Sequence, residues 1–382
     1  MTNLQIVNDY LKTNSVDAWI VYDFKGSNNV LPNFVGEKHF TRKVLLVISK
    51  TEDPYIICHN IDHFQLNSSD YQIVTYNTWQ ELESVLKTSF NKYGSIIMQL
   101  NDNQMLTADS NIVQFVKEHI TNKDIVNNVK ATLTEEQIEN HKIAMQHLVE
   151  IKNNAFKLIE DCLNADKLIT EYDVQKYILK EYENRNLVTD SGPVVAVNQN
   201  AGMPHYEPNQ QEYAVINKGD TILIDLWAKL KTENSCYADI TWVAYAGKDV
   251  PKEYQTAFDV IKKSIELGLE YLNQNYLKGV RGCDLDDVVR NYIKSMDYDK
   301  YFTHRVGHSI YADNTPHGKG TNIDNYESCD CRLIANNTCF SIEPGIYTNS
   351  FGVREEINVC IIDNKVTVTA PIQKQIVTMN IK

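Results

Sequence analysis

The sequence predicts two domains, an α/β domain at the N-terminus followed by a larger α+β domain. The length of 382 residues exceeds that of an average single domain. In the first third of the chain, apolar runs of strand length alternate with helical patterns. Helices and antiparallel strand pairs follow in the remainder. We place the boundary just before a long predicted helix, which gives domains over residues 1–127 and 128–382.

The composition is that of an ordinary globular protein and excludes several functional classes. Hydrophobic residues make up 43% and charged residues 23%, which excludes wholesale disorder and a fibrous protein. The net charge of −13 argues against a general nucleic-acid binder, which needs a basic surface to displace counterions. No segment has the roughly 18 apolar residues that a membrane span requires, and the N-terminal residues lack the features of a secretory signal. We therefore expect a cytoplasmic protein that binds neither nucleic acid nor membranes.

Eight cysteines are scattered along the chain, and we expect them to be reduced thiols. Cys329 and Cys331 form a C-x-C pair. We expect no metal at this pair, because no second Cys or His pair lies at the spacing of a zinc site.

The N-terminal domain is expected to alternate helices and strands. The segments with helical periodicity are Leu4–Lys12, Trp79–Phe90 and Ile112–Ile120. The short apolar runs that indicate strands are Ala18–Tyr22, Val44–Ile48, Tyr55–Cys58 and Ser95–Leu100. This alternation is typical of an α/β domain.

The C-terminal domain is expected to open with a long helix. Thr134-Glu-Glu-Gln137 is a capping-box pattern, and the helix that it begins runs to about Leu163. Thr170 would cap a second helix that ends at Glu183. The later helical segments are Glu253–Leu272 and Leu285–Met296, and the strand-like segments are Ile222–Trp227, Ile240–Tyr245 and the stretch from Cys339 onward.

Two acidic residues interrupt neighbouring apolar strands of the second domain. Asp225 lies inside the run ILIDLW, and Asp239 begins the run DITWVAY. A hairpin centred near Thr232 would place the two carboxylates directly opposite each other, with β-carbons about 4.5–5.5 Å apart. Two carboxylates at that separation repel each other unless a cation lies between them.

A second pair of acidic residues repeats this arrangement further along the chain. Glu343 lies in CFSIEPGIY and Glu356 in GVREEINVCII, and their midpoint falls at Asn349-Ser350, a plausible turn. The alternative is that each acidic residue ends a strand in water. The apolar runs argue against that alternative, because a lone charge inside such a run is unfavourable.

Four carboxylates that face inward require positive charge. His308 in HRVGHSI is the candidate imidazole ligand, and His205, His304 and His317 also lie in segments punctuated by glycine or proline. Oxygen ligands with one imidazole suit a divalent metal such as Mn²⁺, with Co²⁺ or Zn²⁺ as alternatives. Two such ions about 3.5–4 Å apart, bridged by carboxylates and a water, form a hydrolytic centre.

These acidic residues and the histidine motif, in chain order, resemble the pita-bread dinuclear metallopeptidases: methionine aminopeptidase, aminopeptidase P and prolidase. The contexts LIDL, ADIT, HRVGHSI, SIEPGIY and GVREE carry the resemblance, together with SGPVVAVNQNAGMPHYEP upstream. It covers roughly Ser191 to Val359 and implies a pita-bread fold for the second domain. The first 127 residues look like the creatinase-type N-terminal domain of aminopeptidase P and prolidase.

The resemblance implies which residues hold two divalent metal ions. It implies that Asp225 chelates one ion, while Asp239 and Glu356 bridge both ions. His308 and Glu343 would complete the coordination of the other ion.

The resemblance also implies catalytic roles. Glu343 would accept a proton from the bridging water as general base. His205 and His317 would lie near the scissile carbonyl and stabilise the oxyanion. His304 would lie closer to the leaving group, and Arg354 would orient a ligand or the substrate.

The activity that the resemblance implies is a metal-dependent exopeptidase acting on peptides. We expect release of the N-terminal residue from peptides with proline in the second position, by attack of a hydroxide that bridges the metal ions. The alternatives are an Xaa-Pro dipeptidase (prolidase) and a non-catalytic binding protein on the same fold. Prolidases carry an arginine that captures the dipeptide carboxylate, and Cys329 occupies the matching position here, although Arg332 matches a neighbouring family arginine. This difference favours aminopeptidase P, and relatives imply a homodimer.

Overall fold

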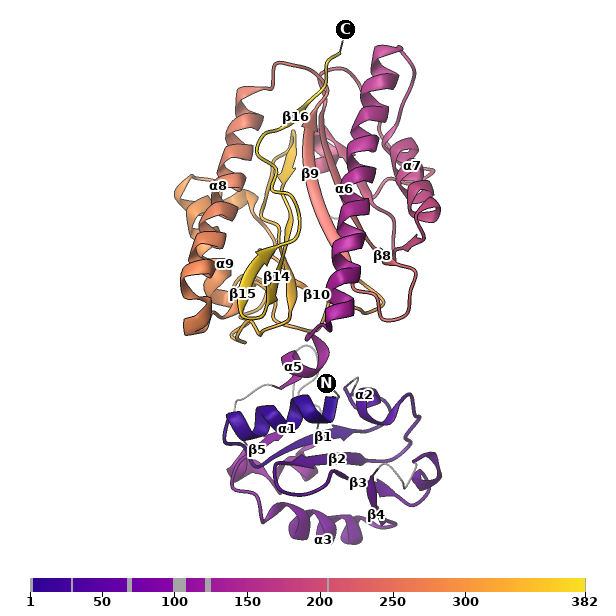
Figure 1. The fold of residues 1–382 in the computed structure, drawn as a ribbon, viewed down its shortest axis with the longest axis vertical. Coiled ribbons are helices and arrows are strands. Elements are labelled where there is room, and N and C mark those ends of the chain that lie inside the picture. Colours follow the sequence, from indigo (N-terminus) through magenta and orange to yellow (C-terminus); the bar gives the residue numbers. More distant parts are fainter. Residues whose placement is uncertain are drawn as a thin grey trace. The chain divides into compact units, whose positions relative to one another are not determined.

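The structure, a computed structural model, describes residues 3–28, 30–66, 71–98, 108–120, 125–204 and 206–381. The chain forms two compact units, Met1–Lys130 and Ala131–Lys382 (Figure 1). The division falls three residues after the boundary expected from the sequence. Each unit contains hydrophobic core residues of its own. Among the described residues, no helix combines the length and the apolar character needed to cross a bilayer.

The N-terminal unit is built on one mixed sheet with the strand order β4-β3-β2-β1-β5. The strands are β1 (Ala18–Asp23), β2 (Val44–Ser49), β3 (Tyr55–His59), β4 (Gln72–Tyr76) and β5 (Ile96–Met98). The pairs β1–β2 and β2–β3 are antiparallel, and the pairs β1–β5 and β3–β4 are parallel. The central strands β1 and β2 are buried along their whole length, which explains their continuous apolar sequences.

Helices cover both faces of this sheet. Helix α1 (Asn3–Thr13) packs Val7 and Leu11 against the face that carries Trp19. Helix α3 (Trp79–Phe90) packs three apolar residues against the opposite face, which carries Ile20. The short helices are α2 (Pro32–Val35), α4 (Ser110–Val113) and α5 (Val126–Lys130). The predicted α/β layering of this unit is confirmed.

The predicted helix over Ile112–Ile120 is wrong. Helix α4 ends at Val113, and only a short 3-10 turn follows at Lys117–His119. Ile120 is extended and forms a parallel bridge with Ile96 of β5, so the chain must leave the helix to reach the edge of the sheet. Pairing with the sheet has therefore overridden the helical spacing of the apolar residues. The last two residues of the strand predicted over Ser95–Leu100 lie outside the described residues.

The C-terminal unit places β-strands between two pairs of helices (Figure 1). One pair is α6 (Glu135–Asn164) and α7 (Glu171–Asn184), and the other is α8 (Lys252–Asn275) and α9 (Gly282–Ser295). Thr134 and Thr170 cap α6 and α7 through capping boxes, as the sequence predicted for Thr134.

The strands of this unit form two sheets and a separate hairpin. The first sheet contains β6 (Leu187–Val188), β7 (Val194–Val197), β8 (Thr221–Leu230), β9 (Ala238–Tyr245) and β16 (Val377–Thr378). The second contains β10 (Ser309–Ile310), β11 (Cys339–Ile342), β14 (Ile357–Ile362) and β15 (Lys365–Val368). The hairpin joins β12 (Gly345–Tyr347) to β13 (Gly352–Arg354). The architecture confirms the predicted α+β, pita-bread fold.

The register of the first acidic hairpin differs from the prediction. Asp225 on β8 pairs with Thr241 on β9, and Asp239 pairs with Trp227. The expectation that the two aspartates lie directly opposite each other is therefore wrong, because Asp239 is displaced by two residues. Each carboxylate faces an uncharged partner, which avoids the repulsion between directly opposed like charges. The even displacement keeps both aspartates on one face of the sheet.

The register of the second acidic hairpin is as predicted. Cys339 pairs with Cys360 in the β11–β14 ladder, and Gly345 pairs with Arg354 in the β12–β13 ladder, so both ladders turn about Asn349-Ser350. Glu343 and Glu356 lie in the gap between these ladders. Their amides donate instead to the carbonyls of Val306 at 2.7 Å and Thr241 at 3.1 Å, which joins the segments that surround the site.

Candidate metal centre

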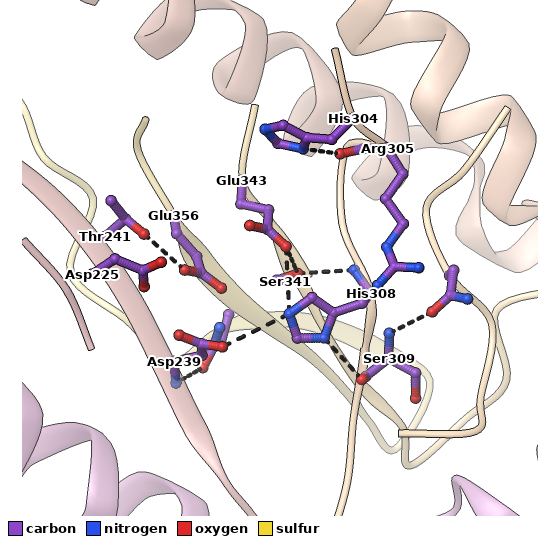
Figure 2. Close-up of polar contacts among 12 residues, drawn as sticks. Asp225, Asp239, Thr241, His304, Arg305, His308, Ser309, Ser341, Glu343 and Glu356 are labelled. Carbon is purple, nitrogen blue, oxygen red and sulfur yellow. Dashed lines mark hydrogen bonds and ion pairs between the residues drawn. The ribbon is translucent and has the colours of Figure 1, made fainter. Parts of the chain in front are cut away.

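The predicted metal ligands come together in the C-terminal unit (Figure 2). They are supplied by β8, by β9, by the segment before β10 and by the gap between the two ladders. All of them line one cavity of about 460 Å³. The residues are Asp225, Asp239, His308, Glu343 and Glu356.

A close approach of two backbones places the histidine. A side chain at Gly307 would put its Cβ 2.0 Å from the carbonyl oxygen of Ser341, so only glycine fits there. The next residue, His308, donates its backbone N–H to Ser341 Oγ at 2.9 Å. The imidazole is thereby anchored beside the end of β11, where Glu343 follows.

The hydrogen bonds of His308 determine which ring nitrogen faces the carboxylates. Nδ1 lies 3.1 Å from the carbonyl oxygen of Ser309, which can only accept, so Nδ1 carries the proton. Nε2 lies 3.3 Å from Glu343 Oε1 and 3.7 Å from Asp239 Oδ2. Burial, followed by the neighbouring His317, lowers the pKa of His308 well below its ordinary value. A neutral ring therefore directs a lone pair at carboxylate oxygens, an arrangement that a cation between them would stabilise.

The carboxylates of the cavity are buried close together. Burial, and then the charges of the other carboxylates, raise the pKa values of Asp239 and Glu356 well above the ordinary range. Among the described residues, one buried oxygen of each of these two groups has no hydrogen-bond partner, and the same is true of Asp225. Donor atoms of Asp239, His308 and Glu356 all lie within 4.8 Å of one another. This oxygen-rich donor set with one imidazole fits divalent metal ions.

Two hydroxyl groups that the sequence analysis did not single out orient the carboxylates. Thr241 donates to Glu356 Oε2 at 3.0 Å, and Ser341 donates to Glu343 Oε1 at 3.0 Å. Each hydroxyl lies two residues from a predicted ligand, since Thr241 follows Asp239 on β9 by two positions. The alternation of side chains along a strand is the signal that would have found them.

Arg354 supplies positive charge at the edge of the cluster. Its guanidinium donates to Asp225 Oδ2 at 2.6 Å and to the hydroxyl of Tyr347 at 2.9 Å. The side chain is buried, so this pair is shielded from water. Arg354 therefore lies beside a predicted ligand, whereas the contact with Tyr347 was not anticipated.

His304 belongs to the same hydrogen-bond network and lines the cavity. Its Nδ1 donates to the carbonyl oxygen of Arg305 at 2.7 Å, and Nε2 accepts from the hydroxyl of Tyr347 at 2.7 Å. Burial, followed by the charge of Arg354, lowers the pKa of His304 to about 3. The ring is therefore neutral at physiological pH.

The two remaining predicted histidines are His317 and His205. The ring centroid of His317 lies 4.1 Å from that of His308, and His317 lines the cavity. A backbone bridge between His317 and Ile310 holds the loop in place. His205 lies outside the described residues.

Further residues that the sequence analysis did not single out also line the cavity. Trp227 lies two residues after Asp225 on β8 and donates its indole N–H to Asp190 Oδ1 at 2.7 Å. Strand alternation could have indicated Trp227, but nothing in the sequence links it to Asp190. Others among the lining residues are Tyr206, Glu207, Arg305 and Glu327.

The chain is similar to known peptidases. It is 20% identical over 366 residues to an Xaa-Pro dipeptidase from Lactobacillus delbrueckii subsp. lactis, covering 93% of this chain and 92% of the relative. An X-Pro aminopeptidase structure from Thermotoga maritima shares the fold with a TM-score of 0.56 and 21% identity, covering 95% of this chain and 98% of that chain. An X-prolyl aminopeptidase from Caenorhabditis elegans, a cytosolic enzyme with a dinuclear active site, gives a TM-score of 0.62 at 15% identity, covering 97% of this chain and 62% of that one.

A family match covers the region that carries the cavity. Metallopeptidase family M24 matches residues 139–363, which is more than half of the chain. That range includes every predicted metal ligand and ends at residue 363, directly after β14. The chain belongs to metallopeptidase family M24.

Proposed function

We propose that this protein is a metal-dependent exopeptidase that releases the N-terminal residue from peptides with proline in the second position. Membership of a metallopeptidase family supports hydrolysis of peptide bonds, and the similar proteins named above support a preference for proline. One observation carries the proposal. Buried oxygens of Asp225, Asp239 and Glu356 have no hydrogen-bond partner among the described residues, and these carboxylates line one cavity together with the neutral imidazole of His308.

We propose that the cluster holds two divalent cations, with Mn²⁺ as the first choice and Co²⁺ or Zn²⁺ as alternatives. Asp225 would serve one ion, His308 and Glu343 the other, and Asp239 and Glu356 both. When bound, such ions supply Lewis-acid activation of a water molecule and of the peptide carbonyl. Thr241 and Ser341 would keep the carboxylates oriented, as hydrogen-bonding partners of metal ligands commonly do.

Glu343 is the proposed general base. Its Oε1 accepts the hydrogen bond from Ser341, which fixes the orientation of the carboxylate. Burial raises the pKa of Glu343 to about 7 in the metal-free fold, whereas the nearby Arg354 acts in the opposite direction. A carboxylate held in this orientation can accept a proton from the attacking water and release it to the departing proline nitrogen.

The other cavity residues have proposed positioning roles. His205 and His317 would stabilise the oxyanion that develops on the scissile carbonyl. His304, whose ring nitrogens are both engaged, would orient Tyr347, which in turn contacts Arg354. Through its hydrogen bond to Asp225, Arg354 would hold that carboxylate toward the cluster.

The expected selectivity follows from the charge of the cavity and from the chemistry of proline. A cluster of carboxylates favours the free amino group of a substrate, which supports exopeptidase action. The peptide bond before proline has no N–H, and the proline ring restricts the φ angle of that residue. The enzyme must therefore recognise proline by the shape of its ring. The indole of Trp227 is an apolar surface on the cavity wall that could contact such a ring.

Dipeptidase action is the second candidate, and Arg305 is the observation that favours it. Arg305 lines the cavity, and its guanidinium lies 4.0 Å from Glu327 at the partly exposed rim. A cation there would suit the terminal carboxylate of a dipeptide. Arg332, by contrast, donates to Asp330 and to backbone carbonyls of the loop, and Cys329 is not among the lining residues.

A peptide panel tests the proposal and separates its two forms. Protein supplied with Mn²⁺ is incubated with Ala-Pro, with longer peptides that begin Ala-Pro, and with matched peptides that begin Ala-Ala, and products are identified by mass. Loss of alanine from the longer Ala-Pro peptides supports an aminopeptidase, whereas cleavage of the dipeptide alone supports a dipeptidase. If repeats with Co²⁺ and with Zn²⁺ also give no cleavage, and elemental analysis finds no bound metal, the result would support a non-catalytic role.

Three further expectations stay predictions. They are a creatinase-type domain over residues 1–127, a homodimer, and a cytoplasmic location. Light scattering of the purified protein would measure the oligomeric state directly.

A further inference from the structure

Three cysteines meet at a place that the proposed peptidase site does not use. Cys283 is the second residue of α9, and Cys329 and Cys331 lie in the loop before β11. The sulfur atoms of Cys283 and Cys331 lie 3.7 Å apart, and those of Cys329 and Cys331 lie 3.4 Å apart. All three sulfur atoms are within 4.8 Å of one another. We call these three residues the thiol cluster.

The backbone around the thiol cluster is held by specific contacts. The amide of Gly282 donates to the carbonyl of Arg332 at 3.1 Å, and the amide of Cys283 donates to the carbonyl of Asp330 at 2.9 Å. A Cβ on Gly282 would lie 1.9 Å from the carbonyl oxygen of Asn322, so glycine is required for this approach. The start of α9 is therefore joined to the loop, and Cys283 is placed without help from the thiols.

The side chain between the two loop cysteines points the other way. Asp330 is buried and accepts hydrogen bonds from the guanidinium of Arg332 at 2.7 Å and from the amide of Asn322 at 2.8 Å. Cys329 and Cys331, on either side of it, are exposed. The anchored Asp330 thus turns both neighbouring thiols away from itself, on the side where the buried Cys283 lies.

We propose that the thiol cluster binds one thiophilic divalent cation of the Zn²⁺ type. A zinc–sulfur distance of about 2.3 Å in tetrahedral geometry separates the sulfur atoms by about 3.8 Å. The two measured separations, 3.7 Å and 3.4 Å, are close to that value before any ion is present. Three thiolates would leave a fourth position open to solvent, because two of the cysteines are exposed.

Binding of the cation would deprotonate the cysteines that ligate it, because the thiolate is the form of cysteine that binds metals. The displaced protons would be released to solvent.

Occupancy would also affect a wall of the peptidase cavity. The loop that carries Cys329 also carries Glu327, which lines that cavity and accepts a hydrogen bond from the amide of Arg305 at 3.0 Å. A cation held between this loop and α9 would restrain the loop. None of the three cysteines lines the cavity itself, so the two sites are separate.

Cadmium is a suitable probe, because cadmium thiolates absorb in the ultraviolet and carboxylate or imidazole complexes do not. The full-length protein is reduced, freed of metal, supplied with Mn²⁺ to fill the carboxylate centre, and titrated with Cd²⁺. We expect a saturable thiolate band in the wild type, and we expect added Zn²⁺ to shift the Cd²⁺ titration to higher concentrations. We expect Cys331→Ser to lose most of this band, whereas Cys162→Ser, which changes a cysteine of α6 outside the cluster, keeps it.

The comparison between these variants decides the proposal. The four other cysteines, Cys58, Cys236, Cys339 and Cys360, are buried and remain unchanged in both variants, so any band from them cancels. Absence of a saturable band in the wild type, a band of equal size in Cys331→Ser, or a Cd²⁺ titration that excess Zn²⁺ does not shift would overturn the proposal. Circular dichroism verifies that the variant is folded, and Cys329→Ser replaces it if it is not. The readout involves no peptide cleavage, so it is independent of the proposed function.

Discussion

The carboxylate centre and the thiol cluster lie in the same unit but depend on a cation to very different degrees. The first gathers ligands such as Asp239 and Glu356 that are almost completely buried, and their charges oppose one another. The second gathers one buried and two exposed thiols, which carry no charge when protonated. Buried like charges at the first site must therefore be neutralised by protons or by a cation, whereas no such charge accumulates among protonated thiols.

The two sites also differ in how their ligands are oriented. At the carboxylate centre, side-chain hydroxyls of Thr241 and Ser341 orient individual oxygen atoms. At the thiol cluster, backbone hydrogen bonds place Cys283 beside the loop, and no donor to a thiol is needed. Hard oxygen ligands with fixed orientation suit Mn²⁺, while soft sulfur ligands suit Zn²⁺ or Cd²⁺. If both proposals hold, the same unit distinguishes two classes of metal ion.

The largest expected effect is the loss of turnover when the proposed base is removed. Glu343→Gln keeps the size of the side chain but cannot accept a proton, so kcat on an Ala-Pro peptide should fall roughly 10²- to 10⁴-fold. Glu266→Gln, which changes a surface ion pair with Lys263 on α8, is the matched control and should leave kcat unchanged. A near-normal kcat in Glu343→Gln would mean that Glu343 is not the general base.

Metal removal should reveal how strongly the carboxylate centre needs its cations. At a free metal concentration about a thousandfold above Kd, binding stabilises the folded state by about 4 kcal/mol, which chelation removes. Urea unfolding with and without chelator measures this difference in the free energy of unfolding. If chelator has no effect on unfolding, the centre does not depend on cations as the comparison requires.

The effect of metal removal should depend on pH in a defined direction. Burial raises the pKa of Glu343 from 4.5 to about 7, so the metal-free folded state holds more protons than the unfolded state between these values. Stability of the metal-free protein should therefore fall as pH rises through this window. Unfolding experiments at about pH 5 and about pH 8 measure the trend, and a metal-free protein that becomes more stable with rising pH would contradict it.

A smaller effect is expected when the orientation of one ligand is disturbed. Thr241→Val keeps the shape of the side chain and removes the hydrogen bond to Glu356, so Mn²⁺ should bind roughly 10- to 100-fold more weakly. Calorimetric titration of the metal-free protein measures the change. Thr256→Val, on the exposed surface of α8, is the control, and equal affinities of the two variants would show that the hydroxyl has no role.

The smallest expected effect concerns the buried amine of Lys152, which belongs to neither of the two sites compared above. Lys152 on α6 is almost fully buried, its Nζ lies 3.1 Å from the ring centroid of Trp242, and burial lowers its pKa to about 7. Its proton is lost in the folded state before it is lost in the unfolded state, so stability should rise with pH above about 7. Lys152→Met should remove this rise and stabilise the protein by about 1 kcal/mol near pH 7.

A control on the same helix makes this last experiment specific. Lys142→Met changes an exposed lysine near Glu139 and should not alter the dependence of unfolding on pH. If Lys152→Met is less stable than the wild type by the same amount at every pH, the contact with Trp242 matters more than desolvation. In that case the fold tolerates the buried charge of Lys152. The argument that buried charges at the carboxylate centre must be neutralised would then be weaker.

Local sequence patterns predicted most of the helices and strands because their causes are local. The capping box of Thr134 and Gln137 marks the start of α6, since both residues satisfy amides of the same turn. The second acidic hairpin had the predicted register because its turn at Asn349-Ser350 is short. The first hairpin did not, because its longer polar connection allows several registers and the packing of β8 against β9 selects one.

Contacts between distant segments could not be predicted in the same way. The capture of Asp225 by Arg354 joins β8 to β13, and the helix expected over Ile112–Ile120 ends early because Ile120 reaches β5. Both features depend on how elements distant in the sequence pack together, and the spacing of residues along the chain does not predict that packing.

By itself, the sequence determined the two-domain organisation, the α+β character of the second domain and the set of acidic residues and histidine that form the centre. Apolar periodicity and the presence of a charged residue inside an apolar run are patterns of a few neighbouring residues, so the sequence alone shows them. Only the tertiary structure decided that Cys283 joins a C-x-C pair 46 residues later in the sequence, where spacing alone had indicated no metal site. The physical reason is that sulfur atoms are brought within binding distance by the packing of a helix against a loop, and that packing depends on the whole unit.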